Sequence, residues 1–250
     1  MKITLVIPCY NEEANIQKGV LDKFGNYTKE NEIFSEVLIV DDGSTDSSKK
    51  LIREKYLPKF LKFKLVEIKH EGKAGAVITG IQKAKGDYVM FSDIDLATPI
   101  EEAEDLLEQV EKGYKIVIGS RNSRREGAPF LRRIMAVGFI FIRNFVIGLP
   151  GIKDTQCGFK IFEKEAADRI ITQLQVFHKI KIINGSSVSA GFDTEFLFIG
   201  HKLGYKIKEV PVDWRHVETK NVNFLKDTIE TLRDILLIKY YDLSKKYNKE

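Results

Sequence analysis

The stretch VMFSDIDLATP, residues 89–99, places Asp93 and Asp95 directly after a short apolar run. Side chains on an extended backbone repeat every two residues, so the two carboxylates are expected on the same side of the chain. Because two like charges this close repel each other, a positive charge is expected between them. The stretch therefore predicts a buried strand that ends at a cation.

Short runs rich in apolar and β-branched residues alternate with helix-like stretches through the first half of the chain. The expected strands lie at 3–8, 36–42, 63–69, 87–93 and 115–120. The expected helices lie near 12–24, 45–56, 73–84 and 100–112. Apolar strands separated by crossover helices are typical of an α/β fold with a mostly parallel sheet and helices on both faces. In such sheets ligands bind beyond the carboxyl ends of the strands.

Polar residues gather at those strand ends. They form the segments CYNEE (9–13), DDGS (41–44), HEGKAG (70–75) and SDID (92–95). Acids gathered at one edge of the sheet repel one another unless a cation or hydrogen-bond donors compensate their charge. A pair of carboxylates suits Mg²⁺ or Mn²⁺, which also take phosphate oxygens and water as ligands. Asp93 and Asp95 are therefore candidate metal ligands; the alternative is that Asp93 caps a turn and Asp95 is a solvated loop acid.

Composition excludes several classes of protein. With 250 residues, of which 43% are hydrophobic, the chain can bury the core of one α/β domain. Its 40 basic and 36 acidic residues give a net charge of only +4, too small for a dedicated nucleic-acid binder. The spacing of Cys9 and Cys157 fits neither a disulfide framework nor a zinc site, so a reducing, cytoplasmic setting is expected. No run approaches the roughly 20 apolar residues that a membrane-spanning helix needs.

Two sets of motifs resemble known enzymes. IPCYNEE (7–13), IVDDGSTD (39–46) and FSDIDLATP (91–99), in this order and spacing, resemble the nucleotide-binding half of the inverting family 2 glycosyltransferases, which have the GT-A fold. The second set is GSR (119–121), DTQCGFKIF (154–162), GFDTEFLF (191–198) and EVPVDW (209–214). It is similar to polyprenyl-phosphate sugar transferases, and DTQCGFK is closest to the dolichyl-phosphate β-glucosyltransferase branch. The resemblance implies a GT-A domain at 1–220, with a donor-binding half at 1–120 and an acceptor-binding half at 121–220.

The resemblance also implies roles for single residues of the donor site. The residues that would bind the nucleotide sugar are Pro8, Tyr10, Asn11, Glu12, Asp42, Lys73 and Asp93. Tyr10 would pack on the nucleobase, which Asp42 would hydrogen-bond, and Asp95 would be the direct metal ligand. Two alternatives stay open: Tyr10 as a loop aromatic on the sheet edge, and Lys73 as a solvated lysine that does not reach the pyrophosphate or the sugar.

The acceptor decides whether the reaction needs a general base. A lipid monophosphate has a second pKa near ~6, so its oxygen is already anionic at neutral pH and needs no base. A sugar hydroxyl would need a carboxylate base, and Asp193 or Glu195 are the candidates. The alternative is that these two acids cap or polarise the helix that follows.

Five arginines cluster after the fifth expected strand, where two anions must be brought together. They are Arg121, Arg124, Arg125, Arg132 and Arg133. The arginine fork suits bidentate contact with phosphate, and the resemblance implies that Arg121 and one of Arg132 or Arg133 grip the acceptor phosphate. Arg124 and Arg125 are expected to attract anionic lipid headgroups, with a solvated charge run as the alternative. Lys220 is a weaker candidate for contact with the diphosphate.

Two amphipathic segments are candidates for contact with a membrane surface. In the segment 129–152, Arg132 and Arg143 fall within about 20° of each other on a helix and leave a broad apolar face. A core helix with one wet edge is the alternative. The segment 221–250 is expected to form a C-terminal helix and a basic tail. Its predicted apolar face, which could dock on the domain, on a second copy or on a membrane, comprises Leu225, Ile229, Leu232 and Leu236.

These observations predict a metal-dependent inverting transferase on the cytoplasmic face of a membrane. It would move glucose from UDP-glucose to a polyprenyl phosphate such as dolichyl or undecaprenyl phosphate, giving a β-linked product. Two other enzymes remain open, one that uses GDP-mannose as donor and one that glycosylates a saccharide hydroxyl. A nucleotide-sugar sensor without catalysis is the alternative from another class, since fold resemblance does not fix function.

Overall fold

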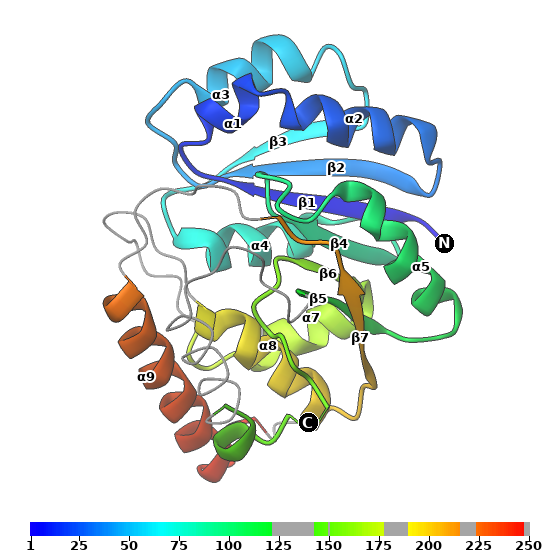
Figure 1. The fold of residues 1–250 in the computed structure, drawn as a ribbon. Helices are drawn as coiled ribbons and strands as arrows, with labels where there is room; N and C mark the ends of the chain where they lie inside the picture. Colours follow the sequence, from blue (N-terminus) through cyan, green and yellow to red (C-terminus); the bar gives the residue numbers. More distant parts are fainter. Residues whose placement is uncertain (122–142, 150, 178–189, 216–223, 248–250) are drawn as a thin grey trace.

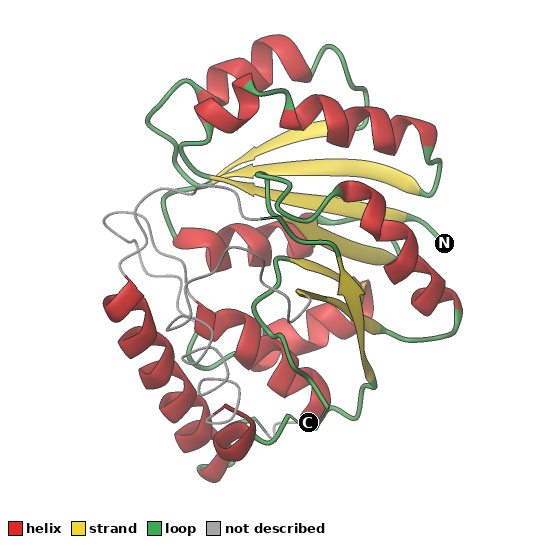
Figure 2. Cartoon of the chain, viewed as in Figure 1, coloured by secondary structure: helices red, strands yellow, loops and turns green. Residues whose placement is uncertain are grey.

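The computed structural model describes residues 1–121, 143–149, 151–177, 190–215 and 224–247 (Figures 1 and 2). Its centre is a seven-stranded sheet of order β3-β2-β1-β4-β6-β5-β7. The strands are β1 (Ile3–Cys9), β2 (Phe34–Asp41), β3 (Phe63–Glu67), β4 (Tyr88–Ser92), β5 (Ile116–Arg121), β6 (Phe159–Glu163) and β7 (Ile207–Val212). Only β6 runs against its neighbours, β4 and β5, and every other pair is parallel. The predicted α/β class with a mostly parallel sheet is confirmed.

Helices cover both faces of the sheet, as Figure 1 shows. The first face carries α1 (Glu13–Gln17), α2 (Val20–Glu30), α3 (Ser48–Leu51), the π-helical turn η1 (Ile52–Tyr56), the 3₁₀ turn η2 (Ile100–Glu102) and α5 (Ala103–Glu111). The second face carries α4 (Gly72–Lys83), α7 (Lys164–Gln173) and α8 (Ala190–Lys202), with α9 (Phe224–Leu243) packed against α8.

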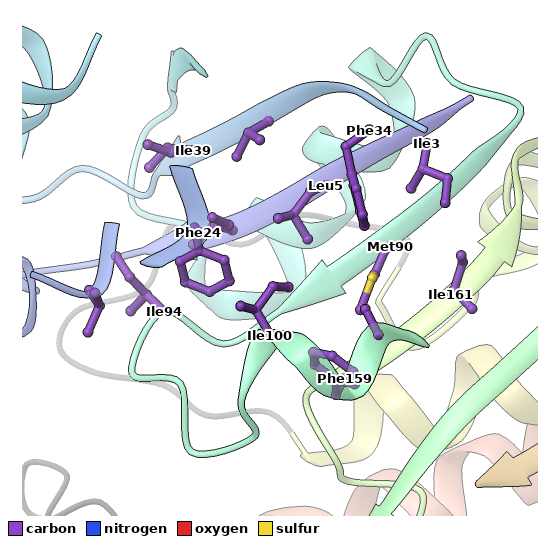
Figure 3. Close-up of a cluster of buried hydrophobic side chains, with 14 of the residues drawn as sticks. Ile3, Leu5, Phe24, Phe34, Ile39, Met90, Ile94, Ile100, Phe159 and Ile161 are labelled. Carbon is purple, nitrogen blue, oxygen red and sulfur yellow. The ribbon is translucent and has the colours of Figure 1, made fainter. Parts of the chain in front are cut away.

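The alternation of side chains along each strand divides the interior into two cores. Ile3 and Leu5 of β1 point to the first core, where Figure 3 shows them with Phe24 of α2 and Met90 of β4. Val6, the residue after Leu5, points to the second core. Successive strand residues face opposite sides of a sheet, so strands buried on both sides must be apolar throughout. This is why the sequence showed continuous apolar runs rather than alternation.

The reversed strand β6 brings its own N-terminal end to the edge at which the other six strands end. Residues 154–158 therefore enter the structure at the carboxyl ends of those strands. The backbone contact is direct, because the N–H of Asp93, just after β4, donates to the carbonyl of Gly158 at 3.1 Å. Antiparallel insertion of β6 thus places the DTQCGFK segment beside the two aspartates.

The polar, solvent-facing stripe expected for the segment 129–152 is wrong at Arg143, and so is the wet edge of the alternative core helix. This arginine is only 1% exposed and lies in a helical turn at 143–147. Its guanidinium donates to Thr155 Oγ1 at 3.1 Å and to the carbonyl of Ile152. The exposed side chain of this turn is Phe145 instead. Residues 122–142, with Arg124, Arg125, Arg132 and Arg133, lie outside the described residues.

The C-terminal helix exists, but the face predicted from its leucines is not the one that packs on the domain. Ile235 and Ile238 are buried in the second core, whereas Ile229 and Leu236 of the predicted face are exposed. The alternative in which this face docks on its own domain is therefore wrong. Helix α9 has two apolar faces, one buried in the second core and one exposed. Among the described residues, no helix combines the length and apolarity needed to cross a bilayer.

Candidate active site

The site lies beside β1 and β4, where the order of the strands across the sheet reverses relative to their order along the chain. From β1 the sheet grows through β2 and β3 on one side and through β4 on the other. Loops that leave adjacent strands on opposite sides create a crevice beyond their carboxyl ends, which is the usual ligand site of open α/β sheets. The polar segments that the sequence singled out follow β1, β2, β3 and β4, so all four meet at this edge.

The loops after β1 and β2 are tied together by Asn11. Its side-chain Oδ1 accepts hydrogen bonds from the backbone N–H groups of Thr45 at 2.7 Å and Asp46 at 3.2 Å. Its own N–H donates to Ser44 Oγ at 2.9 Å. Asn11 adopts a left-handed backbone (φ 52°), which asparagine tolerates better than most residues. The predicted pocket residue thus fixes the shape of the loops.

Pro8 and Glu12 flank this junction. Pro8 lies within β1, opposite Val40 of β2. The N–H of Glu12 donates to Ser48 Oγ at 2.8 Å, and its carboxylate accepts a hydrogen bond from Asn15 Nδ2 at 2.6 Å. Both residues lie at the edge where the sequence placed them, and both support the loop after β1.

Asp42, at the end of β2, fastens the loop that follows β3. Its Oδ1 accepts the N–H of Glu71 at 2.6 Å, and its Oδ2 accepts the N–H of Gly72 at 2.8 Å. Oδ2 also lies 2.8 Å from His70 Nδ1. Burial raises the pKa of Asp42 above its ordinary value, although these donors act in the opposite direction. The carboxylate therefore holds three consecutive residues of the next loop.

His70 is a site residue that the sequence did not reveal. Its ring stacks on the ring of Tyr10, with centroids 4.0 Å apart and planes 10° from parallel. There was little sign of this stacking in the sequence, because the histidine after β3 and the tyrosine after β1 are 60 positions apart and their spacing does not indicate a contact. The two rings form an aromatic stack beside Asp42, and each covers one face of the other.

The positive charge that the two aspartates require is supplied by Lys73. This lysine stands in the first turn of α4, and its Nζ forms an ion pair with Asp93 Oδ1. Burial would lower the pKa of Lys73, but the charges of Asp93, Asp193 and Asp95 outweigh it and raise the pKa above its ordinary value. The reading of Lys73 as a solvated helix-start lysine is therefore wrong.

The two aspartates do not lie on an extended strand, so that expectation is wrong. Strand β4 ends at Ser92, and residues after it turn, with Leu96 in a left-handed conformation (φ 53°). A leucine with positive φ is strained, by roughly 1–3 kcal/mol. Asp95 Oδ1 accepts the N–H of Ala97 at 3.0 Å, which secures the turn. Burial is the largest cause that raises the pKa of Asp95, and the negative charge of Asp93 raises it further.

The donor set fits a hard divalent cation that arrives with phosphate. Asp93 and Asp95 supply carboxylate oxygens, while the described residues contain no group of three or more His, Cys, Asp or Glu able to hold a metal. Mg²⁺ and Mn²⁺ accept such a site, because they take one or two carboxylates and complete their shell with phosphate oxygens and water. Chemistry of this kind fits a nucleoside diphosphate ligand.

Arg121, at the end of β5, is engaged by Asp154. Its Nε and Nη2 donate to the two carboxylate oxygens at 2.6 and 2.8 Å, and its guanidinium lies 5.9 Å from the ring centroid of Trp214. Burial alone would raise the pKa of Asp154, but Arg121 lowers it to about 2. If Arg121 contacts an acceptor phosphate as predicted, its guanidinium would have to bind that phosphate and Asp154 together.

A small cavity joins this cluster to Asp93. Its lining residues are Ser92, Asp93, Ala97, Thr98, Arg121, Gln156, Gly158 and Trp214. They come from the GSR, DTQCGFK and EVPVDW segments and from the end of β4, which lie far apart in the sequence. The structure thus brings all the motifs of the second set, except GFDTEFLF, to one wall of the site.

Asp193 lies on α8 and is held by a buried lysine. Lys160 of β6 is 1% exposed, and its Nζ lies 2.6 Å from Asp193 Oδ1. The same ammonium donates to the carbonyl of Cys157 and lies 5.0 Å from the centroid of the Phe91 ring. Sequence reasoning missed Lys160, since a lysine inside a strand is normally exposed.

Glu195, the other candidate base, is part of the interior. Its carboxylate accepts hydrogen bonds from the N–H groups of Gln175, Val176 and Phe177 at 2.8 to 3.1 Å and from the hydroxyl of Tyr247 at 2.7 Å. Burial raises its pKa. A carboxylate surrounded in this way cannot reach an acceptor, so the geometry contradicts a role as general base. Lys220 lies outside the described residues.

Comparison with known proteins identifies relatives of the whole chain. The model of the family "Glycosyl transferase family 2" matches residues 4–171. The dolichyl-phosphate beta-glucosyltransferase of Dictyostelium discoideum is 33% identical over 255 residues, which cover 95% of this chain and 74% of that protein. The human dolichyl-phosphate beta-glucosyltransferase is 30% identical over 260 residues, with coverage of 95% and 75%.

Solved structures share the fold at lower identity. Glucosyl-3-phosphoglycerate synthase from Mycobacterium tuberculosis, in complex with Mn²⁺, uridine diphosphate and glucosyl-3-phosphoglycerate, superposes with a TM-score of 0.65 at 17% identity, covering 95% of this chain and 79% of that one. Mannosyl-3-phosphoglycerate synthase from Rubrobacter xylanophilus gives a TM-score of 0.63 at 14% identity, with coverage of 100% and 76%. These likenesses agree with the predicted GT-A architecture.

Proposed function

Because the chain belongs to glycosyl transferase family 2, we propose that it transfers glucose from UDP-glucose to a polyprenyl phosphate such as dolichyl or undecaprenyl phosphate, with inversion at the anomeric carbon. One observation carries the proposal: a buried aspartate, an aromatic stack and a pair of carboxylates meet beyond β1 to β4. The identity to dolichyl-phosphate beta-glucosyltransferases supports the choice of sugar and acceptor.

The donor would bind across the strand ends, within the half formed by residues 1–120. The stack of Tyr10 and His70 would offer an outer aromatic face to a nucleobase, and Asp42 lies beside it. Asp93 and Asp95 would hold Mg²⁺ or Mn²⁺, which neutralises the charge that develops on a departing diphosphate. Lys73 stands next to Asp93 and can reach the same phosphates.

The acceptor chemistry follows from the state of the two candidate bases. Glu195 is buried, and Asp193 is paired with Lys160, so neither is poised to take a proton. A phosphate monoester is already anionic at neutral pH and needs no base, which favours a lipid phosphate over a sugar hydroxyl. The half at 121–220 would orient this anion against the anomeric carbon, with Arg121 and one of Arg132 or Arg133 as its phosphate contacts.

The outer face of α9 supports contact with the membrane that contains such an acceptor. Figure 1 shows α9 along the outer edge of the molecule. Its large exposed apolar side chains are Ile229 (67%), Leu236 (63%), Tyr240 (62%) and Leu243 (72%). At 100° per residue these four fall within about 60° of the helix circumference. Exposed Arg233, Lys245 and Lys246 lie along the helix and just past its end, a combination that suits an anionic lipid surface.

A transfer assay tests the proposal directly. The purified chain is incubated with Mn²⁺ or Mg²⁺, a short polyprenyl phosphate and, in separate reactions, labelled UDP-glucose, UDP-GlcNAc or GDP-mannose. Label is expected in the organic phase from UDP-glucose only, and it should be lost in Asp95→Ala. Label from GDP-mannose alone would correct the donor. Binding of nucleotide with no lipid product from any donor would refute the acceptor and favour a saccharide hydroxyl or a sensor.

A further inference from the structure

The ammonium of Lys73 is paired with Asp93, one of the two candidate metal ligands. Its Nζ pairs with Asp93 Oδ1, and the charges of Asp95 and Asp193 also act on it. Asp93 and Asp95 are also the candidate ligands of a divalent cation. Two cations cannot share one carboxylate oxygen without strong mutual repulsion, which is only partly screened at a half-buried site.

The backbone just before Lys73 is held in place, whereas its ammonium lies at the end of a flexible side chain. The preceding residues Glu71 and Gly72 donate their N–H groups to the buried Asp42, which anchors the start of α4. The lysine side chain is 27% exposed and has a flexible four-carbon stem. A displaced ammonium can therefore move within the site without a change in the fold.

We propose that Lys73 and the divalent cation compete for Asp93, so that the metal binds tightly only together with a nucleoside diphosphate. The diphosphate oxygens would accept the displaced ammonium and also complete the shell of the metal. Metal and nucleotide then strengthen each other's binding by the same factor, as linkage requires. This inference rests on the proposed function for the nature of the diphosphate, but the competition itself is a property of Lys73 and Asp93.

Binding of Mn²⁺ to the full chain, measured by the loss of the free-ion EPR signal, tests the competition without sugar or lipid. In the absence of nucleotide, Lys73→Met is expected to bind Mn²⁺ about tenfold or more tightly than the unchanged chain, because a neutral side chain of similar length removes the rival charge. Lys73→Arg, which keeps the charge, is expected to bind as weakly as the unchanged chain. With saturating UDP, the affinity of the unchanged chain should rise at least about tenfold, and the advantage of Lys73→Met should shrink or reverse.

Lys83→Met is the matched control. Lys83 is exposed in the last turn of the same helix, so its substitution changes the net charge equally but lies far from Asp93. It should leave the Mn²⁺ affinity unchanged. Lys73→Gln serves as a second neutral variant if circular dichroism shows that Lys73→Met does not fold.

Three outcomes would overturn the inference. They are neutral Lys73 variants that bind Mn²⁺ no more tightly than the unchanged chain, an equal gain in Lys83→Met, and no Mn²⁺ binding by any variant with or without UDP. A chain that shows the predicted Mn²⁺ pattern but transfers no glucose would refute the proposed function and leave the competition standing. Transfer of glucose without the predicted Mn²⁺ pattern would refute the competition and leave the proposed function standing.

Discussion

Asp93 packs so closely against Gly158 that a β-carbon at position 158 would stand 2.0 Å from Asp93 Oδ2. The N–H of Asp93 also donates to the Gly158 carbonyl at 3.1 Å. Any side chain at 158 would therefore force the Asp93 carboxylate out of its present position, whereas glycine leaves room for it.

Gly158→Ala should displace Asp93 and reduce glucosyl transfer by about 100-fold, because ligand positions must hold to a fraction of an ångström. Mn²⁺ affinity in the presence of UDP should fall as well. Gly25→Ala in α2 is the control, since its β-carbon would meet the Phe60 ring at 2.4 Å on the far side of the sheet. Gly25→Ala should lose stability but keep Mn²⁺ affinity per folded molecule; equal losses of affinity in both variants would contradict the prediction.

His70→Ala should weaken UDP binding about tenfold, because an aromatic pair contributes roughly 0.5–1.5 kcal/mol beyond its buried area. Isothermal titration calorimetry with UDP and Mn²⁺ measures the effect. His201→Ala, on the exposed side of α8, is the control and should bind UDP normally. Unchanged affinity in His70→Ala would remove His70 from the nucleotide site.

Asp193→Asn should keep transfer to a polyprenyl phosphate within about tenfold of the unchanged chain and leave its pH profile unaltered, because an anionic acceptor needs no base. The kcat of each variant between pH 5.5 and 8.5 provides the measurement. Lys160→Met, which leaves Asp193 without its buried partner, should lower stability by about 3–5 kcal/mol. A loss of more than about 10³ in kcat for Asp193→Asn, in a folded protein, would favour a hydroxyl acceptor and a carboxylate base.

Asp154 should make stability depend on pH in the acid range. Its pKa is lowered from 3.8 to about 2 in the folded protein, so its carboxylate stabilises the fold fully above the unfolded value and loses that effect as pH falls through about 2. The contribution is about 2 kcal/mol. Urea unfolding of Asp154→Asn should show a deficit at pH 6 that narrows between about pH 4 and pH 2. A deficit that stays constant over this range would contradict the assignment.

Ile229→Ser combined with Leu236→Ser should reduce binding to anionic vesicles by about tenfold or more, because each substitution removes an apolar side chain worth about 1.5–3 kcal/mol on burial. Sedimentation with phosphatidylserine-containing vesicles measures the bound fraction. Leu61→Ser is the control, since Leu61 is 95% exposed after η1, in a different part of the fold from α9. Binding that is unaffected by the double substitution, or a loss of dimer instead, would assign the face of α9 to a different partner.

The first half of the fold was predictable because its signals are local. Continuous apolar runs, helical stretches between them and acids at the strand ends placed β1 to β5 and Asp93 close to where they lie. The reversal of β6 was not predictable, since strand direction depends on which neighbours it pairs with. The same limit applies to α9, where apolar residues line two faces and periodicity cannot choose the buried one.

Charged residues show the limit of local reasoning most clearly. The two aspartates demanded a cation, but only the fold selects Lys73, 20 positions earlier, for that place. Arg143 was expected on a polar stripe and Lys160 was not singled out, yet both are buried because a carbonyl or a carboxylate from another segment accepts their hydrogen bonds. Such partners come together in tertiary structure, where burial and pairing override the preference of each side chain.

If Asp42 binds the nucleobase as proposed, its hydrogen bonds to the backbone of residues 71 and 72 make donor preference difficult to re-engineer. The carboxylate that stands beside the aromatic stack also holds the backbone of residues 71 and 72, from which Lys73 projects toward Asp93. A substitution at position 42 intended to admit another base would release that backbone and misplace the ammonium. Altered specificity would therefore have to be sought first in Tyr10, whose ring stacks on His70 and takes no part in the hydrogen bonds that anchor α4.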